Sequence, residues 1–197
     1  MPANPMTCAA LVLAAGRAQR FGSDKRLARL PSGQSLLATT LARALDHFAD
    51  VSVVLRPGDD AQLLGIDTRA HLVWAEQAER GMGASLAAGV TALLHTQAQA
   101  VAVLLADMPW VAPGTLQALC RQASAARIVL PLYQGQRGHP VIFGRAFWPA
   151  LVQLQGDQGG RQIIQDNPQA CVTVAVDDAG VVLDVDVPQA LGLPKGH

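Results

Sequence analysis

Short apolar runs alternate with amphipathic segments along the chain. Continuous apolar runs are typical of strands buried on both faces, whereas apolar residues three and four positions apart are typical of helices. The predicted strands cover residues 9–15, 51–55, 71–75, 101–106, 128–132, 140–143 and 172–176. The predicted helices cover residues 35–48, 85–95, 115–123 and 158–165. This alternation predicts an α/β fold in three layers: a mostly parallel sheet with helices on both faces.

Local signals refine this picture. Ser35 and Ser85 precede two of the helices and are predicted to cap them. The pair Asp177-Asp178 is typical of a hairpin turn. We find no linker, repeat or low-complexity segment, so residues 1–197 are expected to form a single domain. In sheets of this kind ligands bind beyond the carboxyl ends of the strands, which directs attention to the loops after Ala15 and Ala106.

Composition narrows the class of partner. The 197 residues are 50% hydrophobic, and 15 Lys and Arg balance 15 Asp and Glu. A net charge of zero argues against a nucleic-acid partner, and the chain lacks the long apolar run of a membrane span and the pattern of a signal peptide. Cys8, Cys120 and Cys171 are far apart, with no CxxC, which predicts free thiols in a reducing compartment. We therefore expect a cytoplasmic protein that acts on small molecules.

A glycine-rich basic loop follows the first predicted strand. It contains Gly16, Arg17, Arg20, Gly22 and Lys25. Glycines let a ligand approach the backbone closely, and three cations suit a polyphosphate. The spacing of the two glycines fits neither a P-loop nor the dinucleotide fingerprint. From these residues alone, a phosphate-binding loop and a solvated basic turn both remain open.

The segment Leu13-Ala14-Ala15-Gly16, with Arg20-Phe21-Gly22 and Lys25 after it, resembles the first motif of the nucleotidyltransferase superfamily. This superfamily includes the molybdenum cofactor cytidylyltransferases and guanylyltransferases. The resemblance implies a Rossmann-like nucleotidyltransferase fold, with Lys25 and Arg20 as catalytic cations. The nucleotide would be bound by Leu13, Ala14, Ala15, Gly16, Arg17, Gly22 and Lys25. The spelling LAAG is similar to the cytidylyl branch, and the methyl group of Ala15 would make a smaller pocket floor that favours a pyrimidine. Ala18 and Asp24 depart from the usual motif.

Two aspartates are candidate metal ligands. Asp107 directly follows a predicted buried strand, where a carboxylate could cap a helix, form a turn or bind a cation. Its segment LADMPWV resembles the family's LADMPxV, and the tail LDVDVPQAL resembles its closing D-x-D motif. The resemblance implies that Asp107, which is also a predicted catalytic residue, and Asp186 hold Mg²⁺, with Mn²⁺ as an alternative. Asp184 would support them or be merely exposed. The tail departs from the family at Val187, Gln189 and Ala190.

Three later segments resemble family motifs. The segment containing Gly81 and Ser85 is similar to GMSxSLxxG and implies nucleotide binding. The segments QGQRGHP and GDQGGR are similar to GxxGHP and GDxGAR of the cytidylyl branch. They imply an acceptor-binding group, although a lone histidine is also often structural. That group is Arg137, His139, Asp157 and Arg161.

The resemblance implies transfer of CMP from CTP to the phosphate of molybdopterin, with release of pyrophosphate. Because the acceptor phosphate is already ionised, no general base is needed. A transient contact with a molybdoenzyme client is expected. Three alternatives stay open: a guanylyltransferase or other NTP transferase with a different phosphorylated acceptor, a glycosyltransferase using Asp184-Val185-Asp186, and a non-catalytic cofactor escort.

Overall fold

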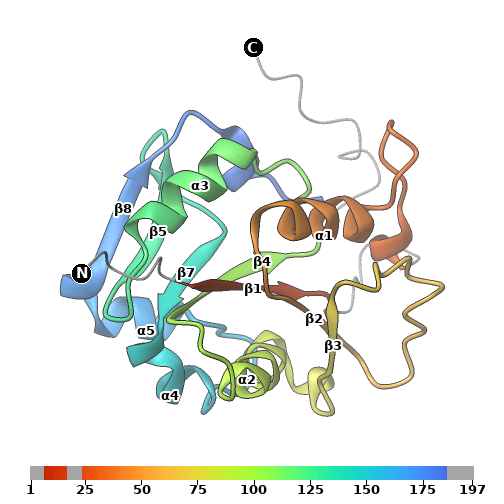
Figure 1. Ribbon diagram of the computed structural model, residues 1–197, viewed down its shortest axis with the longest axis horizontal. Helices are drawn as coiled ribbons and strands as arrows, with labels where there is room; N and C mark the ends of the chain where they lie inside the picture. Colours follow the sequence, from red (N-terminus) through yellow and green to blue (C-terminus); the bar gives the residue numbers. More distant parts are fainter. Residues whose placement is uncertain (1–6, 17–23, 186–197) are drawn as a thin grey trace.

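The computed structural model describes residues 7–16 and 24–185 (Figure 1). Its centre is an eight-stranded sheet in the order β3-β2-β1-β4-β7-β5-β6, with β8 paired to β5. The strands, in chain order, are β1 (Cys8–Leu13), β2 (Val51–Leu55), β3 (His71–Trp74), β4 (Ala100–Leu105), β5 (Ile128–Tyr133), β6 (Gln136–Arg137), β7 (Val141–Gly144) and β8 (Cys171–Ala175). The seven predicted strands all appear, each within two residues of its predicted ends.

Strand direction determines which loops meet. Strands β1 to β4 are mutually parallel, and β5 is parallel to β8. Strand β7 runs antiparallel to both β4 and β5, its two neighbours. The start of β7 therefore lies at the same edge of the sheet as the ends of β1, β4 and β5. The sheet is mixed but mostly parallel, which confirms the predicted fold class.

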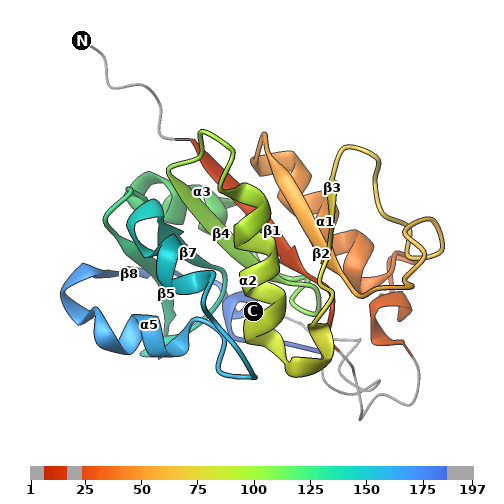
Figure 2. The same ribbon diagram turned by 90° about the horizontal axis from the view of Figure 1, so that it is seen from below.

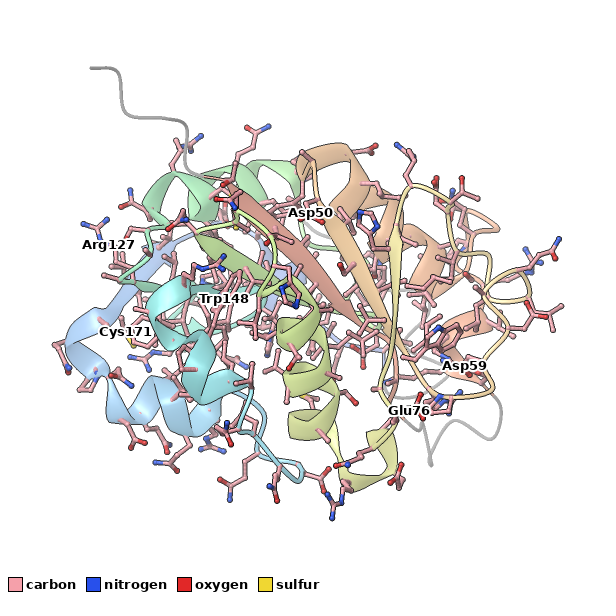
Figure 3. All side chains as sticks on the ribbon, turned by 60° about the horizontal axis from the view of Figure 1, so that its bottom comes forward. Asp50, Asp59, Glu76, Arg127, Trp148 and Cys171 are labelled. Carbon is pink, nitrogen blue, oxygen red and sulfur yellow. The ribbon has the colours of Figure 1, made fainter. Side chains whose placement is uncertain are left out.

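Helices cover both faces of the sheet (Figures 1 and 2). One face carries α1 (Leu36–His47) and α3 (Pro113–Gln122), and the other carries α2 (Met82–Leu93), α4 (Trp148–Leu151) and α5 (Arg161–Asp166). Apolar side chains fill the space between the layers, where Trp148 is only 1% exposed (Figure 3). Within the described ranges, no helix combines the length and the apolar character that crossing a membrane requires.

Helix α1 forms as its sequence predicts. The Ser35 hydroxyl oxygen accepts a hydrogen bond from the Ala38 amide, and the apolar stripe Leu37, Leu41 and Ala44 is buried against the sheet. For α2 the predicted cap is wrong, because the helix begins at Met82 and not at residue 85.

The start of α2 is determined by glycines and not by a serine cap. Gly81 has φ +116°, which glycine tolerates and other residues rarely adopt. Ser85 lies inside the helix, and its hydroxyl donates to the Gly81 carbonyl at 3.4 Å. Farther along, a Cβ at Gly89 would lie 2.5 Å from the Leu11 side chain, so this glycine allows α2 to pack closely on β1.

Two other local predictions are wrong. Asp178 does not form a hairpin turn, because the 3₁₀ turn η5 (Ala179–Val181) follows it. Its carboxylate accepts hydrogen bonds from the Ala112 amide at 2.8 Å and the Thr115 hydroxyl at 2.7 Å. It thus satisfies the start of α3 from a distant part of the chain. Helix α5 begins at Arg161 and not at residue 158, because Gly159 adopts φ +51°.

An arginine secures the far end of α2. The Arg145 guanidinium donates to the carbonyls of Leu94 at 2.7 Å, Thr96 at 2.9 Å and Ala98 at 2.6 Å. It also lies over the Trp148 ring, 4.7 Å from its centre. The C-cap residue of α2 and the turn that follows it are therefore tied to the β7–α4 connection.

Candidate active site

A cleft of about 550 Å³ opens at the carboxyl ends of β1 and β4. Its walls come from the loop after β1, the loop after β4, the start of α2 and the loop before α5. The described residues lining it are Leu13, Ala14, Ala15, Gly16, Lys25, Arg26, Leu36, Ala78, Glu79, Gly81, Met82, Ser85, Leu105, Ala106, Asp107 and Asp157. The two strand-end loops singled out by the sequence therefore meet in one place.

An ion pair crosses the cleft. Lys25 Nζ donates to Asp107 Oδ2 at 2.7 Å, and the two side chains are 18% and 22% exposed. Asp107 does not cap a helix, because α3 begins six residues later with Ala112 at its cap position. Within residues 7–16 and 24–185, Lys25 is the only donor to the Asp107 carboxylate. The second carboxylate oxygen is thus available to a cation.

The end of β1 is rigid and open to ligand. The Ala14 amide donates to the Val54 carbonyl at 3.0 Å, and the Ala106 amide donates to the Leu13 carbonyl at 3.2 Å. Ala14 and Ala15 are each only 2% exposed. A Cβ built on Gly16 would meet no atom of the described residues within 4 Å, so among these residues the space beside this backbone can admit a ligand group.

The start of α2 touches the loop before α5. A Cβ on Gly81 would lie 2.1 Å from Asp157 Oδ1, and a Cβ on Gly83 would lie 2.8 Å from the Gly156 carbonyl oxygen. The Gly83 amide donates to that same oxygen at 2.7 Å. Gly81, a predicted nucleotide-binding residue, and Asp157, a predicted acceptor-binding residue, are therefore direct neighbours. Met82 beside them is 46% exposed and lines the cleft.

His139 lies at the same edge of the sheet, just before β7. Its amide donates to the Val181 carbonyl at 2.8 Å, and the peptide bond to Pro140 is cis. Its Nδ1 is buried and has no hydrogen-bond partner in the described part of the chain. Burial lowers the pKa of His139, against the opposing charges of Asp107 and Asp184, so the ring is neutral at pH 7. The buried Nδ1 thus has unused hydrogen-bonding capacity, but His139 is not among the described residues that line the cleft.

Within the described part of the chain, the structure does not bring the remaining predicted site residues into the cleft lining given above. Arg137 on β6 and Arg161 at the start of α5 are both exposed, and neither is among the described residues that line the cleft. The predicted residues Arg17, Arg20, Gly22 and Asp186 lie outside the described residues. Where the chain is described, no three His, Cys, Asp or Glu side chains gather as a complete metal site.

Sequence reasoning missed Arg26, which lines the cleft, and its partner Asp59. Arg26 follows Lys25 directly, but it is only 5% exposed and pairs with Asp59 in the loop after β2. A charged residue in a polar loop gives no sequence signal of burial. Its partner is 33 positions away, a distance at which local patterns carry no information.

Comparison with known proteins gives the family. Residues 10–173 match the model of the MobA-like NTP transferase domain, and the chain belongs to this family. It is accordingly a nucleotidyltransferase. The family assignment agrees with the strand-end cleft and with the order of the motifs along the chain.

Individual relatives support the same assignment. The purine catabolism protein PucB of Bacillus subtilis is 28% identical over 187 residues, with 90% of each chain covered. A probable molybdenum cofactor guanylyltransferase of Chloroflexus aggregans is 33% identical over 133 residues, which span 66% of this chain and 60% of the relative.

Solved structures agree. The crystal structure of Rv0371c from Mycobacterium tuberculosis has a TM-score of 0.82 and 30% identity over 95% of this chain and 96% of the other. Rv0371c has also been solved in complex with manganese, with a TM-score of 0.74 and 26% identity over 87% of this chain and 89% of that one.

Proposed function

We propose that this nucleotidyltransferase transfers CMP from CTP to the phosphate of molybdopterin. An acceptor phosphate oxygen attacks the α-phosphorus of CTP, the bond between that phosphorus and the α,β-bridging oxygen breaks, and pyrophosphate leaves. The observation that carries the proposal is the Lys25–Asp107 pair beside the open backbone at Gly16. A cation and a carboxylate beside free space would suit the phosphates of a nucleotide, which supports the proposal.

The charges suit this chemistry. Lys25 would neutralise charge that develops on the phosphates, helped by Arg20 and Arg17 from the part of the loop that is not described. Asp107, together with Asp186, would hold a magnesium ion, which would supply positive charge to stabilise the phosphates. The Asp107 carboxylate oxygen that Lys25 leaves unused fits this role. The manganese complex of the relative Rv0371c supports a divalent cation in this fold.

The acceptor would bind on the β7 side of the cleft. His139, whose buried Nδ1 has no partner among the described residues, precedes β7 on this side, and Asp157 lies against Gly81 in the cleft wall. Arg137 and Arg161 would reach the acceptor's phosphate from the exposed rim. Because this phosphate is ionised at neutral pH, positioning and charge stabilisation are sufficient, and no residue is required as a base.

The choice of base rests on Ala15. Its methyl group is buried in the wall of the cleft and reduces the space beside the β1 end, which favours a pyrimidine. The Chloroflexus guanylyltransferase relative favours GTP as the alternative donor.

Pyrophosphate release with each of the four NTPs, Mg²⁺ and molybdopterin decides between the two donors. We expect release with CTP, and a shift toward GTP in Ala15→Gly. A wild-type preference for GTP would refute the cytidylyl assignment.

The same assay tests an alternative from another class. A non-catalytic escort would bind molybdopterin or its nucleotide without releasing pyrophosphate from any NTP, and that result would refute the transferase proposal. We further propose that residues 1–197 act as one domain and pass the product to a molybdoenzyme. Product transfer to a purified apo-molybdoenzyme, with and without the chain, tests this last step.

A further inference from the structure

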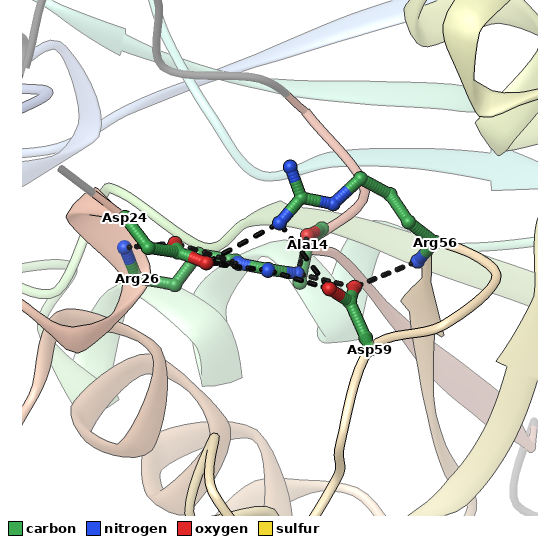
Figure 4. Close-up of polar contacts among 5 residues, drawn as sticks. All are labelled: Ala14, Asp24, Arg26, Arg56 and Asp59. Atoms are coloured by element: carbon green, nitrogen blue, oxygen red, sulfur yellow. Dashed lines mark hydrogen bonds and ion pairs between the residues drawn. The ribbon is translucent and has the colours of Figure 1, made fainter. Parts of the chain in front are cut away.

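A charge network with a buried arginine, Arg26, and its partner Asp59 lies next to Lys25 in the chain (Figure 4). Arg26 is at its centre. Its guanidinium donates to Asp24 Oδ2 at 2.6 Å, to Asp59 Oδ1 at 2.7 Å and to the Ala14 carbonyl at 3.0 Å. Arg56 adds longer bonds of 3.2 Å to both carboxylates. Two guanidinium groups thus face two carboxylates, and the network is electrically neutral.

The network is charged at neutral pH. Burial alone would raise the pKa of Asp59, but hydrogen bonds from Arg26 and Arg56 overcome this effect and lower the pKa to about 2. The hydrogen bond from Arg26 also lowers the pKa of Asp24. Burial alone would lower the pKa of Arg26, but its hydrogen bonds to Asp59 and Asp24 overcome this effect and raise the pKa. Asp24, Arg26 and Asp59 therefore stay ionised across the working range of an enzyme.

The network connects three separate parts of the chain at the cleft. Asp24 and Arg26 flank Lys25, Ala14 lies at the end of β1, and Asp59 belongs to the loop after β2. Asp59 is itself held in place, because its Oδ2 accepts the Arg56 amide at 2.9 Å. The backbone on both sides of Lys25 is consequently fixed to the rigid end of the sheet.

Stability alone does not account for such an arrangement. Burying a charged pair costs desolvation, and well-packed apolar side chains often stabilise a protein as well or better. What the network supplies is a defined geometry, since a planar guanidinium bonds several partners in fixed directions. The group whose geometry it defines is the ammonium of Lys25, 2.7 Å from Asp107.

We propose that Arg26 and Asp59 are positioning residues, which hold the backbone around Lys25 so that its ammonium meets the phosphates of a bound nucleotide. This inference rests on the proposed function, because it assigns Lys25 to the nucleotide. Neither Arg26 nor Asp59 contacts the phosphates in this role. They act through the loop they fix, by restricting the conformations that Lys25 would otherwise sample.

The test compares Asp59→Asn with a matched control in the same loop. Asp67 and Arg69 form an ion pair at 2.8 Å, with the same two-residue spacing as Asp24 and Arg26, but the pair is exposed and neither residue is among the described residues that line the cleft. We expect Asp59→Asn to lower kcat/KM for the nucleotide by about tenfold or more. Asp67→Asn should change it by less than about twofold.

A double-mutant cycle separates positioning from a purely structural role. If Asp59 acts through Lys25, Asp59→Asn should lower kcat/KM by less than about twofold in the Lys25→Ala background. An equal loss in both backgrounds would overturn the proposal, as would full activity of Asp59→Asn. If Asp59→Asn does not fold, Arg56→Gln is used instead, because Arg56 lies at the outer edge of the network and is 25% exposed. It should show a loss of about threefold that also disappears in the Lys25→Ala background.

Binding measurements keep this inference separate from the proposed function. If no NTP yields pyrophosphate with molybdopterin, the transferase proposal fails. The cycle is then measured on the dissociation constant of Mg-CTP or Mg-GTP by calorimetry. Loss of affinity in Asp59→Asn that vanishes without Lys25 still supports positioning, and additive losses still refute it.

Discussion

The contact between α2 and the loop before α5 leads to a quantitative prediction for Gly83→Ala. Gly83 is the second residue of α2, and Gly114 is the second residue of α3. A Cβ at Gly114 would meet nothing within 4 Å, whereas one at Gly83 would lie 2.8 Å from the Gly156 carbonyl oxygen and 2.9 Å from that of Gln155. The two glycines occupy equivalent helix positions and differ in what surrounds them.

The expected energies follow from this difference. Alanine in place of glycine at a compatible helix position stabilises a protein by about 0.5–1 kcal/mol, so Gly114→Ala should gain that amount. Gly83→Ala gains the same helix stabilisation, but the new methyl group displaces the backbone atoms it meets, which costs about 1–3 kcal/mol. The 2.7 Å hydrogen bond to Gly156 is also weakened, which costs about 1 kcal/mol more. The two variants should differ by roughly 2–4 kcal/mol.

Urea unfolding at pH 7, followed by circular dichroism, measures both free energies of unfolding. We also expect Gly83→Ala to raise the KM for the acceptor, since Asp157 moves with the displaced loop, while Gly114→Ala keeps normal kinetics. If the two variants are stabilised equally, the loop before α5 does not press on α2, and the reasoning is wrong.

Three further predictions concern charged groups. Asp107→Asn should lower kcat by about 10³-fold through lost stabilisation of phosphate charge, with an unchanged circular dichroism spectrum; an active variant would contradict the site assignment. Arg145→Ala should lower the free energy of unfolding by about 2–4 kcal/mol, because three carbonyls lose their donor. The control Arg127→Ala removes one exposed hydrogen bond of 3.3 Å and should change this free energy by less than about 0.5 kcal/mol; thermal unfolding measures both. Asp59 has a folded pKa of about 2, below its unfolded value of 3.8, so its stabilisation is present above about pH 4 and lost as the pH falls through 2. Between about pH 5 and pH 2 the free energy of unfolding, measured with urea, should fall by up to about 2 kcal/mol more in the wild type than in Asp59→Asn. If this free energy depends on pH in the same way in both proteins, the lowered pKa of Asp59 is ruled out.

Elements with strong local signals were predictable from the sequence. Strand β2 has the predicted bounds, and α1 starts after the predicted Ser35 cap. Prediction was wrong where glycine geometry or a distant partner decides the structure. Gly81, and not Ser85, is the residue that precedes α2. The Asp178 carboxylate accepts a hydrogen bond from the distant Ala112 amide instead of forming a hairpin turn. The antiparallel direction of β7 was also beyond reach, because an apolar run does not encode the direction of its neighbours.

The candidate site was likewise predictable only in part. Lys25 and Asp107 could be placed together because both follow strands whose carboxyl ends share an edge. The Arg26–Asp59 network could not be predicted, because the sequence offers no reason to bury an arginine in a polar loop. His139 was a candidate from its motif, but its unpaired Nδ1 becomes visible only when Val181 and Asp184 are in place around it.

The reversed strand β7 divides the cleft edge of the sheet into two parts. The parallel strands β1 to β4 present Lys25 and Asp107 at their ends, whereas the segment with His139 enters from the other half, just before the β4–β7 pairing at Val103 and Val141. Insertions or exchanges in that segment would leave the pairing of the first four strands untouched. Changes in that segment could therefore alter the proposed acceptor side of the cleft while preserving the proposed nucleotide side, a route by which one scaffold can acquire many reactions.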